Sequence, residues 1–304
     1  MKIYLTKITT IFFGTFIINH YLCKQNKELM LKNMTRIRKW QVLTSILFCL
    51  IANSLYMHAQ TRDVVYATKK DWQGNMVDLK LDVYQPTCKA DSASKVVIWL
   101  HGGGMYVGHK SVEWDPVSFL ADEFFRRGYV FVSIDYRLNP EWEARGAFRE
   151  TIMNAAEDLA SAVDWVRQNA VKYRMDAHHI IIMGHSSGAE IAGNYYFSNA
   201  LVDESKYDKG GIVAVVSVSG NRLFFDGNKC TGNGNAHCLI VHGDNDDINP
   251  LSDAEIFLKQ LGEKGEVAIM KGNGHGWTKT EEQRKFLVDS IISFLNKLYV
   301  DYKM

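Results

Sequence analysis

The chain carries serines flanked by glycines, a setting in which a hydroxyl can act as a nucleophile. Residues 184–188 read Gly-His-Ser-Ser-Gly, so two serines stand side by side between two glycines. A serine hydroxyl is a weak nucleophile, and it needs an adjacent base and a sharp turn that exposes it. Glycines at both ends would relieve crowding in such a turn. The segment is either a glycine-rich turn that happens to carry hydroxyls or a site of acyl transfer.

Three further segments could supply the rest of this chemistry. His275 lies between glycines in "GNGHGW" and could take the serine proton and return it to a leaving group. An aspartate of "HGDNDDINP" (242–250) could hold the imidazole in one tautomer. A tetrahedral oxyanion needs preorganised N–H donors. The backbone N–H groups of Gly103 and Gly104, in "HGGGMYVG" (101–108), and of the residue after the nucleophile could provide them.

The elements that must position these residues can be read from the apolar pattern. Short runs rich in Val and Ile, typical of strands covered on both faces, occupy residues 95–100, 129–136, 179–184, 212–220, 237–244 and 267–272. Helical patterns lie over residues 151–170, 254–265 and 281–299, the second with glycine at its C-terminal end. The alternating run over 77–83 and the segment 63–68 that precedes it across "DWQGN" predict an antiparallel hairpin. The fold class is therefore α/β, with a mostly parallel sheet, helices on both faces and the site at the C-terminal ends of the strands.

Each of these signals is weak by itself, but their order along the chain is informative. A serine, then an aspartate, then a histidine, each just after a predicted strand, is the order of a nucleophile-elbow hydrolase. The glycine triplet stands upstream, where an oxyanion loop has to be. The combination favours acyl transfer over a turn that happens to carry hydroxyls.

With these motifs the chain resembles the α/β-hydrolase superfamily, and within it the hormone-sensitive-lipase-like and acetyl-esterase-like serine carboxylesterases. The matching segments are "HGGGMYVG", "SIDYRLNP", "DWVRQNA", "GHSSGAEIAG", "HGDNDDINP" and "GHGW", spread over most of residues 65–300. The resemblance implies that Ser186 is the nucleophile, His275 the base and Asp246 the acid, with Asp244 and Asp247 as alternatives.

The same resemblance assigns supporting roles. Ser187 would act through its backbone N–H as the third oxyanion donor, beside Gly103 and Gly104. His101 and Asp135 would support the loops rather than catalyse. Family members often carry Ala where this chain has Ser187, and its hydroxyl is not required by the mechanism.

Two departures from the family pattern bear on the substrate. Many members carry an N-terminal helical cap before the glycine loop, whereas residues 61–100 read here as strands. The segment between the run 212–220 and Asp246 is also short. We therefore expect little or no cap and a shallow, open pocket that favours short-chain or exposed esters, including glycan-linked acetyl or feruloyl esters, over long-chain lipids.

The N-terminal region reads as an export region over residues 1–60. Residues 34–59 have a basic start, an apolar stretch over 42–55 and Ala59 before Gln60, which is the layout of a cleaved signal peptide. An uncleaved membrane anchor is the alternative, and Phe48 before Cys49 fits a lipoprotein site poorly. Residues 1–33 hold a second apolar run, and we interpret them as an over-extended reading frame with the true start at Met34 or Met30. Residues 61–304 would form a single secreted or periplasmic domain, with membrane contact only through the export signal.

Charge and cysteine content limit the partners. Residues 1–60 hold eight of the 35 basic residues and one of the 34 acidic ones, so the remainder carries a net charge of about −6. A mildly acidic body without a basic stripe argues against nucleic acid. No zinc motif occurs, and the mechanism requires neither metal nor cofactor. Whether Cys230 and Cys238 pair stays open, as does the oligomeric state.

Two other functions compete with an esterase. A serine–histidine–aspartate triad serves any acyl transfer, so an amidase, formamidase or peptidase on the same scaffold is the first alternative. A binding module that kept the fold without activity is the second.

Overall fold

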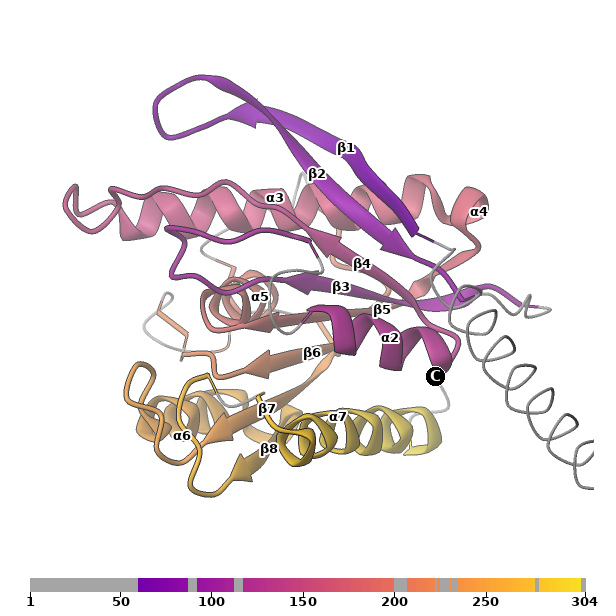
Figure 1. The fold of residues 1–304 in the computed structure, drawn as a ribbon, viewed down its shortest axis with the longest axis vertical. Helices are drawn as coiled ribbons and strands as arrows, with labels where there is room; N and C mark the ends of the chain where they lie inside the picture. The colour runs from indigo at the N-terminus through magenta and orange to yellow at the C-terminus, as the bar shows by residue number, and fades with distance from the viewer. Residues whose placement is uncertain are drawn as a thin grey trace, which may run out of the picture. The chain divides into compact units, whose positions relative to one another are not determined.

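The computed structural model of the chain describes residues 60–86, 92–111, 117–199, 207–221, 223–224, 230, 234–276 and 279–301 (Figure 1). The predicted export region up to residue 59 lies outside these ranges, as does Cys88.

A single sheet of eight strands organises the described chain, in the order β1-β2-β4-β3-β5-β6-β7-β8. The strands are β1 (Gln60–Lys70), β2 (Met76–Tyr84), β3 (Ser94–Leu100), β4 (Val130–Ile134), β5 (Met175–His185), β6 (Ile212–Val218), β7 (His237–Gly243) and β8 (Gly265–Met270). The strands from β4 to β8 in this order are parallel. Because β2 is antiparallel to both β1 and β4, the predicted N-terminal hairpin is confirmed and forms one edge of the sheet (Figure 1).

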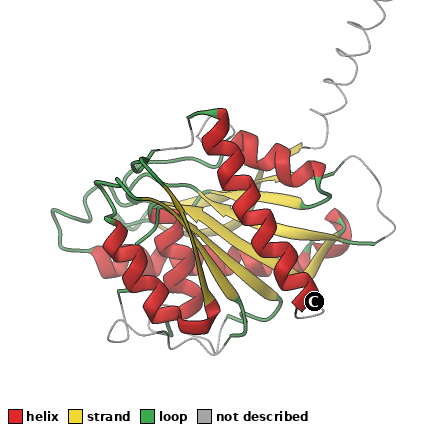
Figure 2. Cartoon of the chain, turned by 90° about the horizontal axis from the view of Figure 1, so that it is seen from below, coloured by secondary structure: helices red, strands yellow, loops and turns green. Residues whose placement is uncertain are grey.

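Helices cover both faces of the sheet (Figure 2). One core lies beneath α3 (Phe148–Gln168), α5 (Ser187–Phe197) and α6 (Leu251–Leu261), and a second beneath α2 (Val117–Arg126) and α7 (Glu281–Asp301). Strand β3 shows why its apolar run is continuous, since Ile98 faces the first core and Val97 and Trp99 the second. The predicted α/β class is confirmed.

The helices predicted over 151–170 and 281–299 are α3 and α7 with ends shifted by up to three residues, and the clearest difference lies at the end of α6. The helix predicted over 254–265 ends at Leu261, because Gly262 adopts φ 60° and a short 3₁₀ turn, η1 (Gly262–Lys264), follows it. The helix-ending glycine is therefore Gly262 rather than Gly265. A four-residue helix, α4 (Ala170–Tyr173), continues α3 towards β5.

Three further observations concern the described residues only. No helix among them is long and apolar enough to cross a membrane. They contain no group of three or more His, Cys, Asp or Glu side chains placed to hold a metal ion. Cys230 and Cys238 are both free thiols, and burial raises the pKa of Cys238 well above its ordinary value.

Candidate active site

The predicted nucleophile lies at a sharp turn between β5 and α5. Ser186 adopts φ 52° and ψ −122°, a strained conformation for a residue with a side chain. A Cβ added to Gly184 would come within 2.3 Å of the Gly188 backbone, and one added to Gly188 within 2.3 Å of the Leu100 carbonyl oxygen. The glycines on either side of the two serines are thus required by close backbone packing, which gives the Gly-x-Ser-x-Gly spacing its physical reason.

Ser186, His275 and Asp246 come together although up to 89 residues separate them in sequence. The Ser186 hydroxyl lies 2.8 Å from Nε2 of His275. Nδ1 of His275 lies 2.8 Å and 3.0 Å from the two carboxylate oxygens of Asp246. Because an ionised carboxylate only accepts, Nδ1 carries the proton and Nε2 is left to accept the serine hydroxyl. This arrangement can move a proton from serine to imidazole, and the catalytic roles assigned to these residues stay a prediction.

The loop after β7 selects one of the three candidate acids. The side chain of Asp246 is fully buried, and its Oδ1 accepts the backbone N–H groups of Ile248 at 3.0 Å and Asn249 at 2.8 Å. Asp244 instead accepts the Gly272 N–H at 2.5 Å, away from the imidazole, and Asp247 is exposed. The alternatives to Asp246 therefore have no hydrogen bond to His275.

Two carbonyl groups of the glycine loop after β3 are held by hydrogen bonds within the loop. In a trans peptide the C=O and the following N–H point in opposite directions. Nδ1–H of His101 donates to the Gly102 carbonyl at 2.7 Å, which directs the N–H of Gly103 away from that ring. The Gly103 carbonyl accepts from Tyr106 and Val107 at 3.0 Å and 3.2 Å, which orients the N–H of Gly104 in the same manner.

The loop lies directly against the nucleophile. A Cβ on Gly102 would sit 3.2 Å from Cβ of Ser186. Gly103 and Gly104 adopt φ 113° and 63°, and a Cβ on Gly103 would approach the Val107 carbonyl oxygen to 2.0 Å. Ser187 is the first residue of α5, so its N–H has no acceptor within the helix. That Gly103, Gly104 and Ser187 donate to an oxyanion stays a prediction.

The segment after β4, which carries Asp135 and Tyr136, hydrogen-bonds to the glycine loop. The Tyr136 hydroxyl donates to the His101 carbonyl at 2.9 Å, and its ring stacks on the His101 ring at 4.4 Å. Oδ1 of Asp135 accepts the Lys110 N–H at 2.7 Å at the far end of the loop. Burial lowers the pKa of His101 to about 4, so the ring stays neutral in its supporting position. These hydrogen bonds of His101 and Asp135 thus lie within the glycine loop or at its far end.

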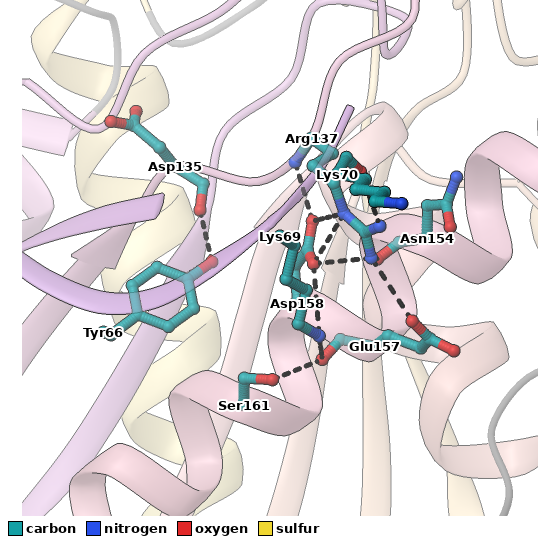
Figure 3. Close-up of polar contacts among 9 residues, drawn as sticks. All are labelled: Tyr66, Lys69, Lys70, Asp135, Arg137, Asn154, Glu157, Asp158 and Ser161. Carbon is teal, nitrogen blue, oxygen red and sulfur yellow. Dashed lines mark hydrogen bonds and ion pairs between the residues drawn. The ribbon is translucent and has the colours of Figure 1, made fainter. Parts of the chain in front are cut away.

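A buried ion pair anchors this segment to α3. Figure 3 shows Arg137 donating through Nε to Asp158 at 2.9 Å and through its backbone N–H to the same carboxylate at 2.8 Å. Arg137 also donates to the carbonyl groups of Lys70 and Asn154. Burial raises the pKa of Asp158, and the Arg137 guanidinium opposes that effect. The ion pair joins β1, α3 and the segment that carries Asp135 and Tyr136.

Several supporting residues were not singled out from the sequence. Nε1–H of Trp142 donates to the Gly104 carbonyl at 2.9 Å, and Lys110 is buried in ion pairs with Asp63 at 2.9 Å and Asp82 at 3.0 Å. Asn249 lies beside Asp246. Their partners are distant in sequence, so local patterns could not predict these contacts. The sequence signals nearest to them were the segment "HGDNDDINP", which contains Asn249, and the segment "HGGGMYVG", which Lys110 follows.

Comparison with known proteins places this geometry in a family. The family model BD-FAE matches residues 81–235, just over half of the 304-residue chain. Secreted lipase 5 of Gibberella zeae is 30% identical over 145 residues, which is 46% of this chain and 25% of that protein. Esterase E4 of Myzus persicae is 31% identical over 125 residues, covering 40% of this chain and 22% of that protein. The chain spans about a quarter or less of the length of these curated relatives.

Solved structures give the fold independently. Esterase 2 of Thermogutta terrifontis, phosphoramylated by tabun, superposes with a TM-score of 0.64 at 21% identity, over 80% of this chain and 96% of that one. Its butyrate-bound form superposes with a TM-score of 0.62. The expected α/β-hydrolase fold is thereby confirmed. The chain belongs to the BD-FAE family, among the α/β-hydrolase carboxylesterases that its motifs resemble.

Proposed function

We propose that the protein is a serine carboxylic-ester hydrolase that works through Ser186, His275 and Asp246 and an acyl-enzyme intermediate. The observation that carries the proposal is the unbroken chain from the Ser186 hydroxyl to Nε2 of His275 at 2.8 Å and from Nδ1 to Asp246 at 2.8 Å. Ser186 lies beside the glycine loop, since a Cβ on Gly102 would sit 3.2 Å from Cβ of Ser186. Esterases and a lipase among the relatives agree with this chemistry.

The reaction follows from the geometry in two halves. Oγ of Ser186 attacks the acyl carbon while its proton passes to Nε2 of His275, and the carbonyl oxygen becomes an oxyanion among the N–H groups of Gly103, Gly104 and Ser187. Collapse of this intermediate breaks the C–O bond, and the imidazolium returns the proton to the departing alcohol. Water then attacks the acyl-enzyme with His275 again as base, which releases the acid and restores Ser186. Asp246 stabilises the imidazolium in both halves.

The substrate class we propose is a short-chain or exposed ester, including acetyl or feruloyl groups on glycans. Supporting it, the described residues before His101 pair into β1, β2 and β3 of the sheet instead of building a helical cap over the site. Without a cap from these described residues, we expect little apolar wall for a long acyl chain. Rates on p-nitrophenyl acetate, butyrate and palmitate would test this, and a preference for palmitate would overturn it. Acetylated xylan and methyl ferulate would then identify the alcohol.

The esterase proposal is tested with a fluorophosphonate probe and the Ser186→Ala variant. We expect the parent protein to be labelled and to hydrolyse p-nitrophenyl acetate, and the variant to lose both properties. Amides matched to the best ester belong in the same panel, and faster hydrolysis of the amide would assign the scaffold to an amidase. Absence of labelling in a folded parent protein would identify a binding module.

We propose further that the domain is exported by the segment 34–59. The basic start, the apolar stretch over 42–55 and Ala59 before Gln60 support this, and one relative is named a secreted lipase. The N-terminal sequence of the protein recovered outside the cytoplasm should begin near Gln60. Recovery of a chain that retains the apolar stretch in the membrane fraction would favour the anchor.

A further inference from the structure

Glu190 is a carboxylate that the proposed mechanism does not use, although it stands one helical turn from the nucleophile. It lies in the first turn of α5, and its backbone N–H donates to the Ser186 carbonyl at 3.0 Å. Its side chain is half-buried and hydrogen-bonds to Asn221 and Asn249. Glu190 therefore bridges the helix that carries the nucleophile and the loop that carries the acid.

Asn249 is the group through which Glu190 reaches the triad. The backbone N–H of Asn249 donates to Oδ1 of Asp246 at 2.8 Å, and its carbonyl accepts Nε2–H of His242 at 2.8 Å. Its amide Nδ2 donates to the Ser219 carbonyl at 2.7 Å, and its Oδ1 accepts from Asn221 at 3.4 Å. Asn249 is 5% exposed, so nearly all of its polar groups are engaged inside the protein.

A count of amide hydrogens indicates which protonation state of Glu190 fits the site between Asn221 and Asn249. Each asparagine amide has two N–H groups. One N–H of Asn249 is given to Ser219 and one N–H of Asn221 to Asn249, which leaves the second N–H of each for Glu190. An ionised carboxylate accepts both, whereas a protonated carboxyl presents a hydrogen of its own and accepts less strongly.

Among the described residues, none of the groups that act on the Glu190 carboxylate is a cation. Burial raises its pKa to about 7, the two amide hydrogen bonds oppose that effect, and Asp253 on α6 adds to it. Other titratable groups of the described chain nearby include Tyr136 after β4 and, beyond Asn249, His242 and Asp246 of the acid loop. The carboxyl thus changes its charge in the pH range in which a serine hydrolase works.

We propose that Glu190 is a positioning residue of the triad, whose carboxylate holds Asn249 and through it the orientation of Asp246. The inference rests on the proposed esterase function and adds a residue that touches neither substrate nor reacting atoms. With Glu190 ionised, Asn249 is fixed and Asp246 faces Nδ1 of His275. With Glu190 neutral, Asn249 loses its best acceptor and the acid loop loosens.

The first test compares Glu190→Gln with the parent protein on p-nitrophenyl acetate. Glutamine keeps the size but brings an N–H₂ group against two amide donors, so we expect kcat to fall about tenfold with KM unchanged. Glu255→Gln on α6 is the matched control, because that carboxylate is exposed and outside this network. A raised KM with kcat unchanged would overturn positioning and indicate substrate contact. An unchanged kcat and KM would overturn the proposal outright.

The pH profile separates this role from a merely structural one. In the parent protein the profile of kcat against pH should contain a rise of about tenfold near pH 7 from Glu190. Glu190→Gln and Asn249→Ala should each lack this rise, and the double variant should lose no more activity than either single one. A step near pH 7 that persists in Asn249→Ala, or additive losses in the double variant, would overturn the proposal.

Failure of the inference and failure of the esterase proposal give different results. If the parent protein hydrolyses esters and its profile has no rise near pH 7 that the two variants abolish, only the role of Glu190 is wrong. If the parent is folded and hydrolyses nothing, the esterase proposal itself is wrong. If Glu190→Gln does not fold, the pH profiles of kcat for the parent protein and for Asn249→Ala are sufficient to test the role of Glu190.

Discussion

The two halves of the site are held in place by different forces. The nucleophile turn and the glycine loop are fixed by close contact, since added Cβ atoms at Gly103, Gly184 and Gly188 would lie 2.0–2.3 Å from backbone atoms. The acid loop is fixed by hydrogen bonds that converge on Asp246 and Asn249. In the first half, a substitution that displaces the nucleophile or the glycine loop must also disturb the fold. In the second, a change of one polar atom can alter the chemistry while the fold remains.

The strongest test of this contrast is Asp246→Asn. Asparagine keeps the shape and can still accept the N–H groups of Ile248 and Asn249, but it no longer stabilises the imidazolium. We expect kcat to fall by about 10⁴-fold with stability within about 1 kcal/mol of the parent. Ester kinetics and urea unfolding would measure both.

The matched control for Asp246 is Asp247→Asn, an exposed neighbour that should retain full activity. Loss of activity in Asp247→Asn, or activity of Asp246→Asn equal to that of the parent protein, would show that Asp246 is not the acid of the triad.

Gly188→Ala should damage activity and fold together. Its Cβ would overlap the Leu100 carbonyl oxygen, which belongs to β3 and cannot move without disturbing the sheet. We expect destabilisation of about 3 kcal/mol and a loss of kcat/KM of at least about 10²-fold. Gly193→Ala, on the same helix but facing the Phe257 ring, should stay within about 1 kcal/mol of the parent. A stable but inactive Gly188→Ala would break the contrast between the two halves.

The pH dependence of stability should have opposite signs for His101 of the glycine loop and for Glu190, which contacts the acid loop. Unfolded His101 binds its proton near pH 6.5 and folded His101 only near pH 4, so the unfolded state holds more protons in between. Stability is therefore lost as the pH falls through this window, by about 3 kcal/mol for this 1%-exposed ring. For Glu190 the folded pKa of about 7 lies above the ordinary 4.5, so its contribution weakens as the pH rises from 4.5 to 7.

Urea unfolding of His101→Gln and Glu190→Gln between pH 4 and 8 measures these slopes. The first variant should lose acid sensitivity relative to the parent protein, and the second should gain it. Parallel curves for the parent and His101→Gln would contradict the assignment of a buried neutral imidazole.

The smallest effect is expected for Ser187→Ala. The Ser187 hydroxyl is buried and has a 3.4 Å contact with the Tyr136 hydroxyl, while its proposed task belongs to the backbone N–H. We expect kcat/KM to stay within about threefold of the parent, because alanine keeps that N–H. A loss as deep as that of Ser186→Ala would mean that the nucleophile is the wrong serine.

Local patterns in the sequence predicted the part of the molecule that depends on local structure. The apolar runs and the glycines of "GHSSG" and "HGGG" placed the strands, the turn and the order of Ser186, Asp246 and His275, because each of these needs only neighbouring residues. The sequence also allowed Asp244 and Asp247 as acids, and a choice among three adjacent aspartates depends on which one faces an imidazole 29 residues away.

The contacts that the sequence did not predict join residues from separate elements. Glu190 looked like an ordinary helix residue, and its place opposite Asn249 follows from the packing of α5 beside the loop after β7. The ion pairs of Arg137 with Asp158 and of Lys110 with Asp82 likewise arise only when β1, β2 and α3 are assembled. The helix end at Gly262 rather than Gly265 was decided by a backbone dihedral that either glycine could adopt.

The 89 residues between Ser186 and His275 bear on how the protein is made. A chain that emerges from the ribosome presents its serine well before the imidazole exists, and β8, which carries His275 past the sheet, can pair only after β7 is in place. On the proposed mechanism the newborn chain therefore stays inert towards esters until His275 has been synthesised and β8 has paired with β7. The appearance of hydrolytic activity during refolding should then follow the last step of sheet assembly.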